Sequence, residues 1–386
     1  MNRLIIIHYH EIALKGKNRD FFENTLVDNI KKSLGEGVYK EVKRMHGRVL
    51  VYLNKDFDES YARDKIKKVF GIANFSFGFL GSLDLGKLGD EVWAKIENKS
   101  PESFRVTAKR SDKRYPKNSQ EISRDLGAIL YHRFEEKVKV DLKNPDLHVF
   151  CEITEKGSFF YFEKERAYGG LPVGTAGKLM SLISSGFDSP VASWKMIRRG
   201  AKVVFIHFHS YPYTSKASYE NVKDIVKKLT EYQFSSKIYF VPFSDIQKEI
   251  SVKCTASLRV ILYRRFMLRI AERLANKENI KALVTGDSLA QVASQTIDNI
   301  SVIAESVNIP ILRPLIGENK EDIIEWSEKI DTYNLSSQPY EDCCSLFMPT
   351  HPETHGKLDK IIETEEKLDI DEMIDSAIEE IEIIKF

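Results

Sequence analysis

Residues 181–194 read SLISSGFDSPVASW, a short apolar run that ends in serines, one glycine and one aspartate before a helical pattern begins. Small polar residues between a strand and a helix allow a ligand to approach the backbone, and the first amides of a helix attract anions. Pro190 suits the first turn of that helix, because proline has no N–H to leave unpaired. The stretch therefore predicts a strand, an anion-binding loop and a helix in succession.

The predicted loop, Ser184 to Ser189, is not a Walker A loop. It lacks the GK[ST] sequence, so no lysine of the loop reaches for a γ-phosphate. Its backbone amides and serine hydroxyls suit pyrophosphate, and the Asp188 carboxylate suits Mg²⁺ bound against that group. A simple capped helix start, with Ser184 or Ser185 as the cap, is the alternative interpretation.

Strands and helices alternate beyond this loop. We expect strands at 179–183, 202–208, 237–241 and 281–284, and helices at 190–199, 215–230 and 257–275. Such alternation indicates βαβ units, and therefore a parallel sheet with helices on both faces. Ligands of these sheets bind beyond the carboxyl ends of the strands, which is where the loop is predicted to lie.

The N-terminal half has a different order of elements. Residues 1–59 predict a strand, a helix and two strands, as in a small ferredoxin-like α+β domain. Residues 60–166 begin with a helix at 61–70 and continue with further strands and helices. The glycine-rich run 167–178 is typical of a linker, with a phosphate cradle as the alternative, and 179–386 form the α/β domain.

Length and composition exclude several classes of protein. The 386 residues suggest two or three domains, and the hydrophobic content of 42% fits a soluble globular protein. No run of 18 apolar residues is present, so we expect no membrane association, and the N-terminus does not resemble a signal peptide. Four cysteines are too few for a disulfide scaffold of this length. We expect a cytoplasmic protein.

Two segments are strongly charged although the net charge is only +1. Residues 105–117 hold six Lys and Arg against one Asp, which fits a solvated loop or a nucleic-acid-binding surface equally well. Residues 360–386 hold ten Asp and Glu against three Lys, with isoleucines at helical spacing. This acidic tail predicts an amphipathic helical segment that packs on its own protein.

Five segments carry a resemblance to a known family. Ser184 to Ser189 resemble the SGGxDS motif of PP-loop pyrophosphatases, which adenylate a carbonyl oxygen with ATP and release pyrophosphate. The longer run GGLPVGTAGKLMSLISSGFDSPVASW is similar to one branch of that superfamily, the tRNA 4-thiouridine synthetases. The segments that resemble the same branch, in the family's order, are HEIALKGKNRDFF (10–22), FHSYPYTS (208–215), TGDSLAQVASQT (285–296) and YEDCCSLFMPTHP (340–352).

The resemblance implies an α/β fold in which a doubly wound PP-loop domain of the adenine nucleotide alpha hydrolase type follows a ferredoxin-like domain and an RNA-binding THUMP domain. It implies a tRNA sulfurtransferase that uses ATP and Mg²⁺ to adenylate the C4 oxygen of uridine 8 in tRNA. Persulfide sulfur from a cysteine desulfurase then displaces AMP to give 4-thiouridine. The implied phosphate contacts to tRNA are Arg105, Lys109, Arg110, Lys113, Arg114 and Lys117. A homodimer is an open expectation.

The same resemblance assigns residues to the nucleotide. The implied contacts are Leu182, Ile183, Ser184, Ser185, Gly186, Ser189, His207, Phe208, Arg264, Gly286 and Gln295. Arg265 is the near rival of Arg264, and Gln291 is expected one helical turn from Gln295. Asp188 and Lys320 are implied to act on the phosphates, with a surface lysine as the alternative for Lys320. A metal at His207-x-His209 lacks a third ligand.

Cys343 and Cys344 carry the remaining chemistry. Zinc bound with His351 and His355 is one interpretation, although adjacent cysteines rarely present two thiolates to one tetrahedral ion. A buried structural pair is a second. The resemblance instead places a persulfide-forming cysteine here and favours Cys343 over Cys344.

Two departures from the family's pattern bear on the function. Ser185 replaces the first motif glycine, so its side chain either crowds the pyrophosphate or donates a hydroxyl to it. No rhodanese-like domain is expected after Phe386, which weakens the family's link to thiamine thiazole synthesis. The alternatives are another PP-loop tRNA-modifying enzyme, or a non-catalytic tRNA-binding protein whose loop has decayed.

Overall fold

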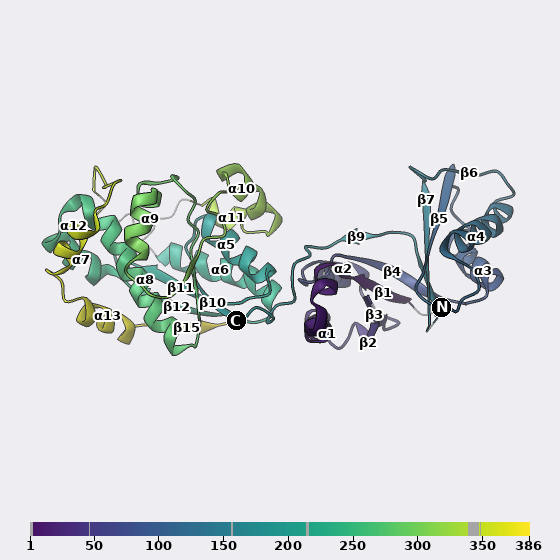
Figure 1. The fold of residues 1–386 in the computed structure, drawn as a ribbon, viewed down its shortest axis with the longest axis horizontal. Coiled ribbons are helices and arrows are strands. Elements are labelled where there is room, and N and C mark those ends of the chain that lie inside the picture. The colour runs from purple at the N-terminus through teal and green to yellow at the C-terminus, as the bar shows by residue number, and fades with distance from the viewer. Residues whose placement is uncertain (1–2, 46, 156, 214–215, 339–346, 348) are drawn as a thin grey trace. The chain divides into compact units, whose positions relative to one another are not determined.

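The protein is described by a computed structural model that covers residues 3–45, 47–155, 157–213, 216–338, 347 and 349–386. Its chain forms two compact units, Met1–Leu171 and Pro172–Phe386 (Figure 1). None of the helices in the described ranges has the length and hydropathy needed to cross a membrane.

The first unit is built on one mixed sheet, which has nine strands in the described residues. The strand order is β2-β3-β1-β4-β8-β7-β5-β6, with β9 paired to β4. The elements are β1 (Arg3–His8), α1 (Arg19–Leu34), β2 (Tyr39–Met45), β3 (Arg48–Leu53), α2 (Glu59–Lys67), β4 (Asn74–Gly81), α3 (Leu85–Ile96), β5 (Ser103–Arg110), α4 (Ser119–Arg133), β6 (Lys139–Val140), β7 (Leu147–Thr154), β8 (Gly157–Tyr161) and β9 (Glu165–Arg166).

The helices of the first unit pack on this sheet in two separate hydrophobic cores. In the first, α1 and α2 pack on β1 and β3, and Ala62 and Ile66 of α2 are fully buried against Ile5 and Val51. In the second, α3 and α4 pack beside β5 and β7 (Figure 1). We expected helix 61–70 to open the second domain. Helix α2 instead belongs to the first core, because Ala62 and Ile66, which lie one helical turn apart on its apolar face, are buried there.

Strand β4 joins the two halves of the sheet. It pairs antiparallel with β1 on one side and with β8 on the other. Leu4 and Ile6 of β1 pack with Phe159 and Tyr161 of β8 across β4. At Gly78 of β4 an added Cβ would lie 2.8 Å from Ile6 Cδ1, so the absent side chain is what lets the neighbouring strands pack together.

A buried charge also connects these strands. Glu152 of β7, which is 1% exposed, accepts hydrogen bonds from Arg48 of β3 and from the Tyr161 hydroxyl, and lies 3.0 Å from His8 Nε2. Burial alone raises the pKa of Glu152, but bonding to His8 and the charges of His8 and Arg48 outweigh it and lower the pKa to about 2. The carboxylate therefore ties both halves of the unit together while ionised.

The second unit contains a six-stranded sheet in the order β14-β13-β10-β11-β12-β15. The strands pair in parallel except for β15, which is antiparallel to β12. The elements are β10 (Lys178–Leu182), α5 (Asp188–Arg198), β11 (Lys202–His209), α6 (Lys216–Gln233), β12 (Lys237–Pro242), α7 (Ser244–Lys253), α8 (Arg259–Lys277), β13 (Leu283–Val284), α9 (Ile297–Ala304), β14 (Ile311–Leu312), α10 (Lys320–Lys329), α11 (Tyr333–Ser336), α12 (Leu358–Glu365), α13 (Ile370–Glu379) and β15 (Glu382–Lys385).

Helices cover both faces of this second sheet, as the alternation predicts (Figure 1). One large core unites the sheet with α7, α8, α9, α12 and α13. The acidic tail is helical in α12 and α13, as expected, but its last residues form the edge strand β15 instead. Four register pairs with β12, from Phe240↔Glu382 to Lys237↔Lys385, hold Glu382–Lys385 as a strand.

The expected linker 167–178 is bonded to both units. The Ala167 and Gly169 amides donate to the carbonyls of Ala73 and Ile72. The Gly174 and Ala176 amides both donate to the Gly200 carbonyl. The boundary between the two units falls inside this run, between Leu171 and Pro172.

Candidate active site

The loop between β10 and α5 is closed on itself by serines. The Ser184 amide donates to Ser189 Oγ over 2.8 Å, and the two hydroxyl oxygens lie 3.1 Å apart. Helix α5 begins at Asp188 with Phe187 as its N-cap, and no side-chain capping hydrogen bond is made. The capped-start interpretation, with Ser184 or Ser185 as cap, is therefore wrong, and the helix leaves its first amides for another acceptor.

Asp188 holds two side chains that come from distant segments. Lys320 Nζ, at the first residue of α10, donates to Asp188 Oδ1 over 2.7 Å. Gln291 Nε2 donates to Asp188 Oδ2 over 3.0 Å. We expected Gln291 and Gln295 on one helical face, but Gln291 lies in a turn and only Gln295 is in the short 3-10 helix Ala293–Gln295.

A cavity of about 420 Å³ opens beside this loop at the carboxyl ends of the strands. Among its lining residues are the predicted contacts Leu182, Ile183, Ser184, Asp188, Ser189, His207, Phe208, Arg264, Gly286 and Gln295. Ser185, Gly186 and Lys320 do not line it. Ser185 is buried, and the Gly186 carbonyl accepts from Ser336 Oγ over 3.3 Å. The structure thus brings most of the predicted nucleotide contacts together around one cavity.

Two of the predicted contacts, His207 and Phe208, are packed at the end of β11. His207 Nδ1 lies 2.9 Å from the Ile183 carbonyl oxygen, and it donates a hydrogen bond to that oxygen when Nδ1 carries the proton. Phe208 packs on Phe243. Burial and the neighbouring His207 lower the pKa of His209 to about 4. No group of three possible metal-binding side chains occurs in the part of the chain that the structure describes.

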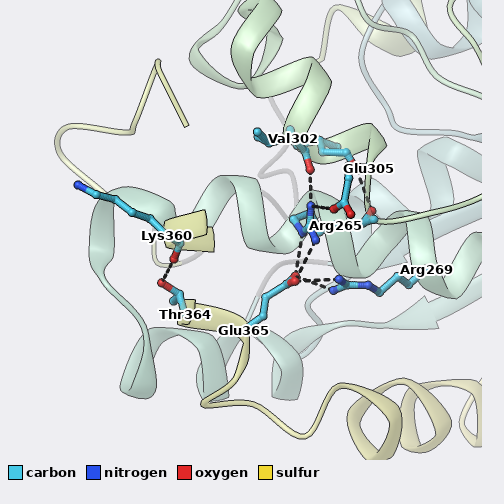
Figure 2. A network of polar contacts seen from close by, with 9 residues as sticks. Arg265, Arg269, Val302, Glu305, Lys360, Thr364 and Glu365 are labelled. Atoms are coloured by element: carbon cyan, nitrogen blue, oxygen red, sulfur yellow. Dashed lines mark hydrogen bonds and ion pairs between the residues drawn. The ribbon is translucent and has the colours of Figure 1, made fainter. Parts of the chain in front are cut away.

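The structure separates Arg264 from its sequence neighbour Arg265. Arg264 lines the cavity, where its Nη1 donates to Ser294 Oγ over 3.0 Å and its Nη2 to Asp287. Arg265 is 2% exposed and points into the core, where Glu365 accepts two hydrogen bonds of 2.9 Å from it (Figure 2). Arg264 is therefore the cavity residue, and Arg265 holds α8 to the segments that cover it.

Gly286 brings the loop after β13 against the loop after β10. An added Cβ at this glycine would lie 2.8 Å from the Ser189 nitrogen and 2.9 Å from the Asp188 carbonyl carbon. Because such contacts are too close for any side chain, only glycine lets these two loops touch. Gly286 therefore serves the contact between the backbones of the two loops, besides lining the cavity.

Sequence reasoning missed Asp287, Thr285 and Arg313. Asp287 is 4% exposed and bonded to both arginines, Arg264 and Arg313. Burial raises the pKa of Asp287, but the charge and hydrogen bond of Arg264 outweigh it and lower that pKa. The available signal was an aspartate directly after a glycine that lies two residues beyond a predicted strand.

The predicted RNA-contacting run is only partly free of internal contacts. Arg110 donates to the Tyr115 carbonyl and Arg105 to the Leu142 carbonyl. Arg114 and Lys117 form ion pairs with Asp112 and Asp125. Among the described residues, the exposed side chains of Lys109 and Lys113 make no hydrogen bond or ion pair.

Cys343 and Cys344 lie outside the residues that the structure describes. Their predicted role in sulfur transfer therefore stays a prediction. The described residues nearest to them on the C-terminal side are Phe347 and those from 349 onward, of which Pro352 lines the cavity.

Comparison with known families places the chain. The model of the ThiI family, described as a thiamine biosynthesis protein, matches residues 174–370. The chain belongs to this family. The ThiI ferredoxin-like domain matches residues 4–76 and the THUMP domain matches residues 86–163. The family resemblance and the α/β fold class predicted from the sequence are thereby confirmed.

Relatives of the ThiI family match along the whole chain. The probable tRNA sulfurtransferase of Caldanaerobacter subterraneus subsp. tengcongensis is 44% identical, and the match covers 99% of both chains. That of Alkaliphilus oremlandii is 42% identical, and the match covers 100% of this chain and 99% of the relative. The crystal structure of a 4-thiouridine synthetase–RNA complex with bound ATP is 36% identical, with a TM-score of 0.90 and full coverage of both chains. PH1313 from Pyrococcus horikoshii is 26% identical, with a TM-score of 0.65, 86% coverage of this chain and 100% of that one.

Proposed function

We propose that this chain uses ATP to convert a uridine of tRNA to 4-thiouridine. The observation that carries the proposal is the cavity at the carboxyl edge of the second sheet, closed at one end by the Ser184–Ser189 loop. The chain belongs to the same family as the probable tRNA sulfurtransferases, and its fold matches that of a 4-thiouridine synthetase with bound ATP. Asp188, Gly286 and Gln295 are all in place around that cavity, which argues against a decayed loop.

ATP would bind with its nucleoside in the cavity and its phosphates toward the loop. Arg264 and Gln295 line the cavity, and their polar atoms provide contacts for the nucleotide. The uncapped N-terminus of α5 attracts the pyrophosphate that leaves when the C4 oxygen of uridine attacks the α-phosphorus. Lys320, which lies 2.7 Å from Asp188, brings a positive charge to the same place.

Asp188 is also the residue that would hold Mg²⁺. Magnesium is commonly bound by one or two carboxylates together with substrate phosphates, and Asp188 supplies one carboxylate beside the proposed phosphate site. When bound, the ion would neutralise charge on the departing pyrophosphate. Asp188 accepts hydrogen bonds from Lys320 and Gln291, so those two side chains would orient it toward the ion or yield to it.

Sulfur would enter through a persulfide on Cys343. Its terminal sulfur attacks C4 of the adenylated uridine, and AMP leaves with the former C4 oxygen, so that the uridine is joined to Cys343 through an S–S bond. A second thiol then attacks Cys343 Sγ, which releases 4-thiouridine and leaves a new disulfide that a thiol reductant must reduce before the next turnover. The cysteine desulfurase that supplies the sulfur, a homodimeric assembly and a cytoplasmic location remain predictions from the sequence. So does a link to thiamine thiazole synthesis.

The decisive experiment is an assay of pyrophosphate release from ATP by the purified protein with and without unmodified tRNA. We expect release that depends on tRNA and, with a persulfide donor present, the absorbance of 4-thiouridine in the product. Release that depends on another acceptor, such as a carboxylate, would favour a different PP-loop enzyme. Protein that binds tRNA but releases no pyrophosphate would be the non-catalytic alternative.

The run 105–117 is proposed as part of the tRNA-binding surface. Its two exposed lysines without internal partners, Lys109 and Lys113, are best placed to contact phosphates. Arg105 and Arg110 keep their charge, because a carbonyl oxygen that accepts a hydrogen bond does not neutralise a guanidinium. Such contacts give affinity that depends on salt and only weakly on sequence.

Charge reversal in this run tests that role. Lys109→Glu, Arg110→Glu and Lys113→Glu together should weaken tRNA binding and reduce its salt dependence, because each lost phosphate contact removes about 0.7–0.9 from the slope of log affinity against log salt. The same reversal at three exposed lysines of the second unit, Lys227, Lys277 and Lys281, is the control for net charge. Unchanged affinity and slope would mean that the run is only solvated surface.

A further inference from the structure

Asp287 lies between the nucleotide cavity and the scaffold behind it. It follows β13 at the carboxyl edge of the sheet, and the residue is 4% exposed. It lines the cavity, yet both of its oxygens are already engaged by protein side chains. A carboxylate in this position has no capacity left that would make it a primary ligand-binding group.

Its two oxygens serve different neighbours. Oδ2 accepts from the Thr285 hydroxyl over 2.7 Å and from Arg313 Nε over 3.2 Å, and Arg313 does not line the cavity. Oδ1 accepts from Arg264 Nη2 and from Gln295 Nε2, the latter over 3.4 Å. Both of those side chains line the cavity and are among the predicted nucleotide contacts.

The carboxylate also selects which end of Gln295 is left for a ligand. A carboxylate only accepts hydrogen bonds when ionised, so it takes the amide nitrogen of Gln295 and not the amide oxygen. Gln295 Oε1 is buried and has no hydrogen-bond partner among the described residues, although Gln295 lines the cavity. An acceptor left in this way calls for a donor on the ligand.

We propose that Asp287 is a positioning residue for nucleotide binding. Thr285 and Arg313 fix Oδ2, and Oδ1 then holds Arg264 and the nitrogen of Gln295 so that both side chains face the cavity in one arrangement. This inference rests on the proposed function, in which the cavity binds ATP. It adds a specific cause for the arrangement of two residues that come from different elements, α8 and the segment after β13.

Replacement by asparagine is the sharpest probe. Asn has the shape of Asp, but it supplies one acceptor oxygen and two N–H donors, so at least one side of the network loses its acceptor. The Arg264 guanidinium or the Thr285–Arg313 pair would then be left without its partner. We expect Asp287→Asn to raise the KM for ATP by about tenfold or more while kcat of pyrophosphate release changes much less.

The chain offers a matched control in Glu365. This carboxylate is 6% exposed and also holds two arginines, accepting from Arg265 and from Arg269 (Figure 2). It does not line the cavity. Glu365→Gln removes an equally buried charge and should lower the unfolding temperature, yet it should leave the KM for ATP unchanged.

The full-length variants are compared by steady-state pyrophosphate release with tRNA, by direct binding of a non-hydrolysable ATP analogue and by thermal unfolding. Because Asp287 is proposed to act through Arg264 and Gln295, Asp287→Asn should add little in a background of Arg264→Ala and Gln295→Ala. If Asp287→Asn does not fold, Arg313→Gln is the second variant, and it should raise the KM for ATP about threefold, because it removes one of the two side chains that fix Oδ2.

Two results would overturn the inference while leaving the proposed function intact. One is a wild-type KM for ATP in a folded Asp287→Asn protein. The other is an effect of Asp287→Asn that stays in full in the Arg264→Ala, Gln295→Ala background. A wild-type protein that fails to bind the ATP analogue contradicts the proposed function itself, and the inference falls with it.

Discussion

Asp188→Ala is expected to reduce tRNA-dependent pyrophosphate release by a factor of about 1,000 or more, because it removes a group that acts directly on the departing phosphates. The loss also removes the carboxylate that accepts from Gln291 and Lys320, and leaves the Lys320 ammonium over the Phe187 ring. Binding of tRNA should stay within about twofold of the wild type, because Asp188 and the run 105–117 belong to different units. The two measurements are pyrophosphate release and the tRNA dissociation constant at a fixed salt concentration.

Asp188→Asn is the companion variant, since it keeps the hydrogen bond from Lys320 but not the negative charge. We expect it to be nearly as inactive as Asp188→Ala, because an amide is a much weaker ligand for Mg²⁺ than a carboxylate. Thermal unfolding of both variants checks that the loop still folds. A parallel loss of tRNA affinity in a folded variant would show that binding and adenylation are not divided between the two units.

Cys343→Ser is expected to abolish 4-thiouridine formation from a persulfide donor while pyrophosphate release continues. Adenylation involves only ATP and the uridine oxygen, so this half-reaction needs no thiol. A thiolate takes up sulfur far better than a thiol does, and the neighbouring Glu341 and Asp342 do not favour the thiolate. Activation would therefore come from Lys320, from the helix terminus at the loop or from bound tRNA. The readouts are the absorbance of thiolated tRNA and pyrophosphate release, followed in parallel.

Cys344→Ser is the matched control for Cys343→Ser. It should retain measurable thiolation, unless the two cysteines form a disulfide as the new thiocarbonyl is released, which adjacent residues do only with strain. Free sulfide should restore some thiolation to Cys343→Ser, because it bypasses the carrier. Full thiolation by Cys343→Ser from a persulfide donor would exclude this residue as the carrier.

The parallel sheet and its ligand-binding edge could be predicted because they rest on local patterns. The change from strand to loop to helix at residues 181–194 is visible in the sequence, and the position of such loops in βαβ units follows from the fold class. The ends of the predicted elements in the second unit accordingly lie within a few residues of those observed. A boundary that depends on packing was harder: nothing in the sequence of α2 says which of two cores buries Ala62 and Ile66.

Side-chain partners that meet only in the folded chain were not predictable. Arg264 and Arg265 differ by about 100° around the helix axis, and a single sequence does not fix which of them faces the cavity. Asp287 and Arg313 are 26 residues apart and come together through the pairing of β13 with β14. Gln291 was expected on a helix because its spacing from Gln295 fits one, but the segment forms a turn that brings it to Asp188.

Strand β4 gives the first unit a mechanical property that its division into two domain families conceals. The ferredoxin-like and THUMP segments share this strand and the buried Glu152 network, so they are parts of one continuous sheet. A ligand that spans both segments would bind to a single sheet, so that the entropy of aligning two separately tethered modules is not lost on binding. Separating the two segments would leave β4 on one fragment with an unpaired edge, because it would lose either β1 or β8.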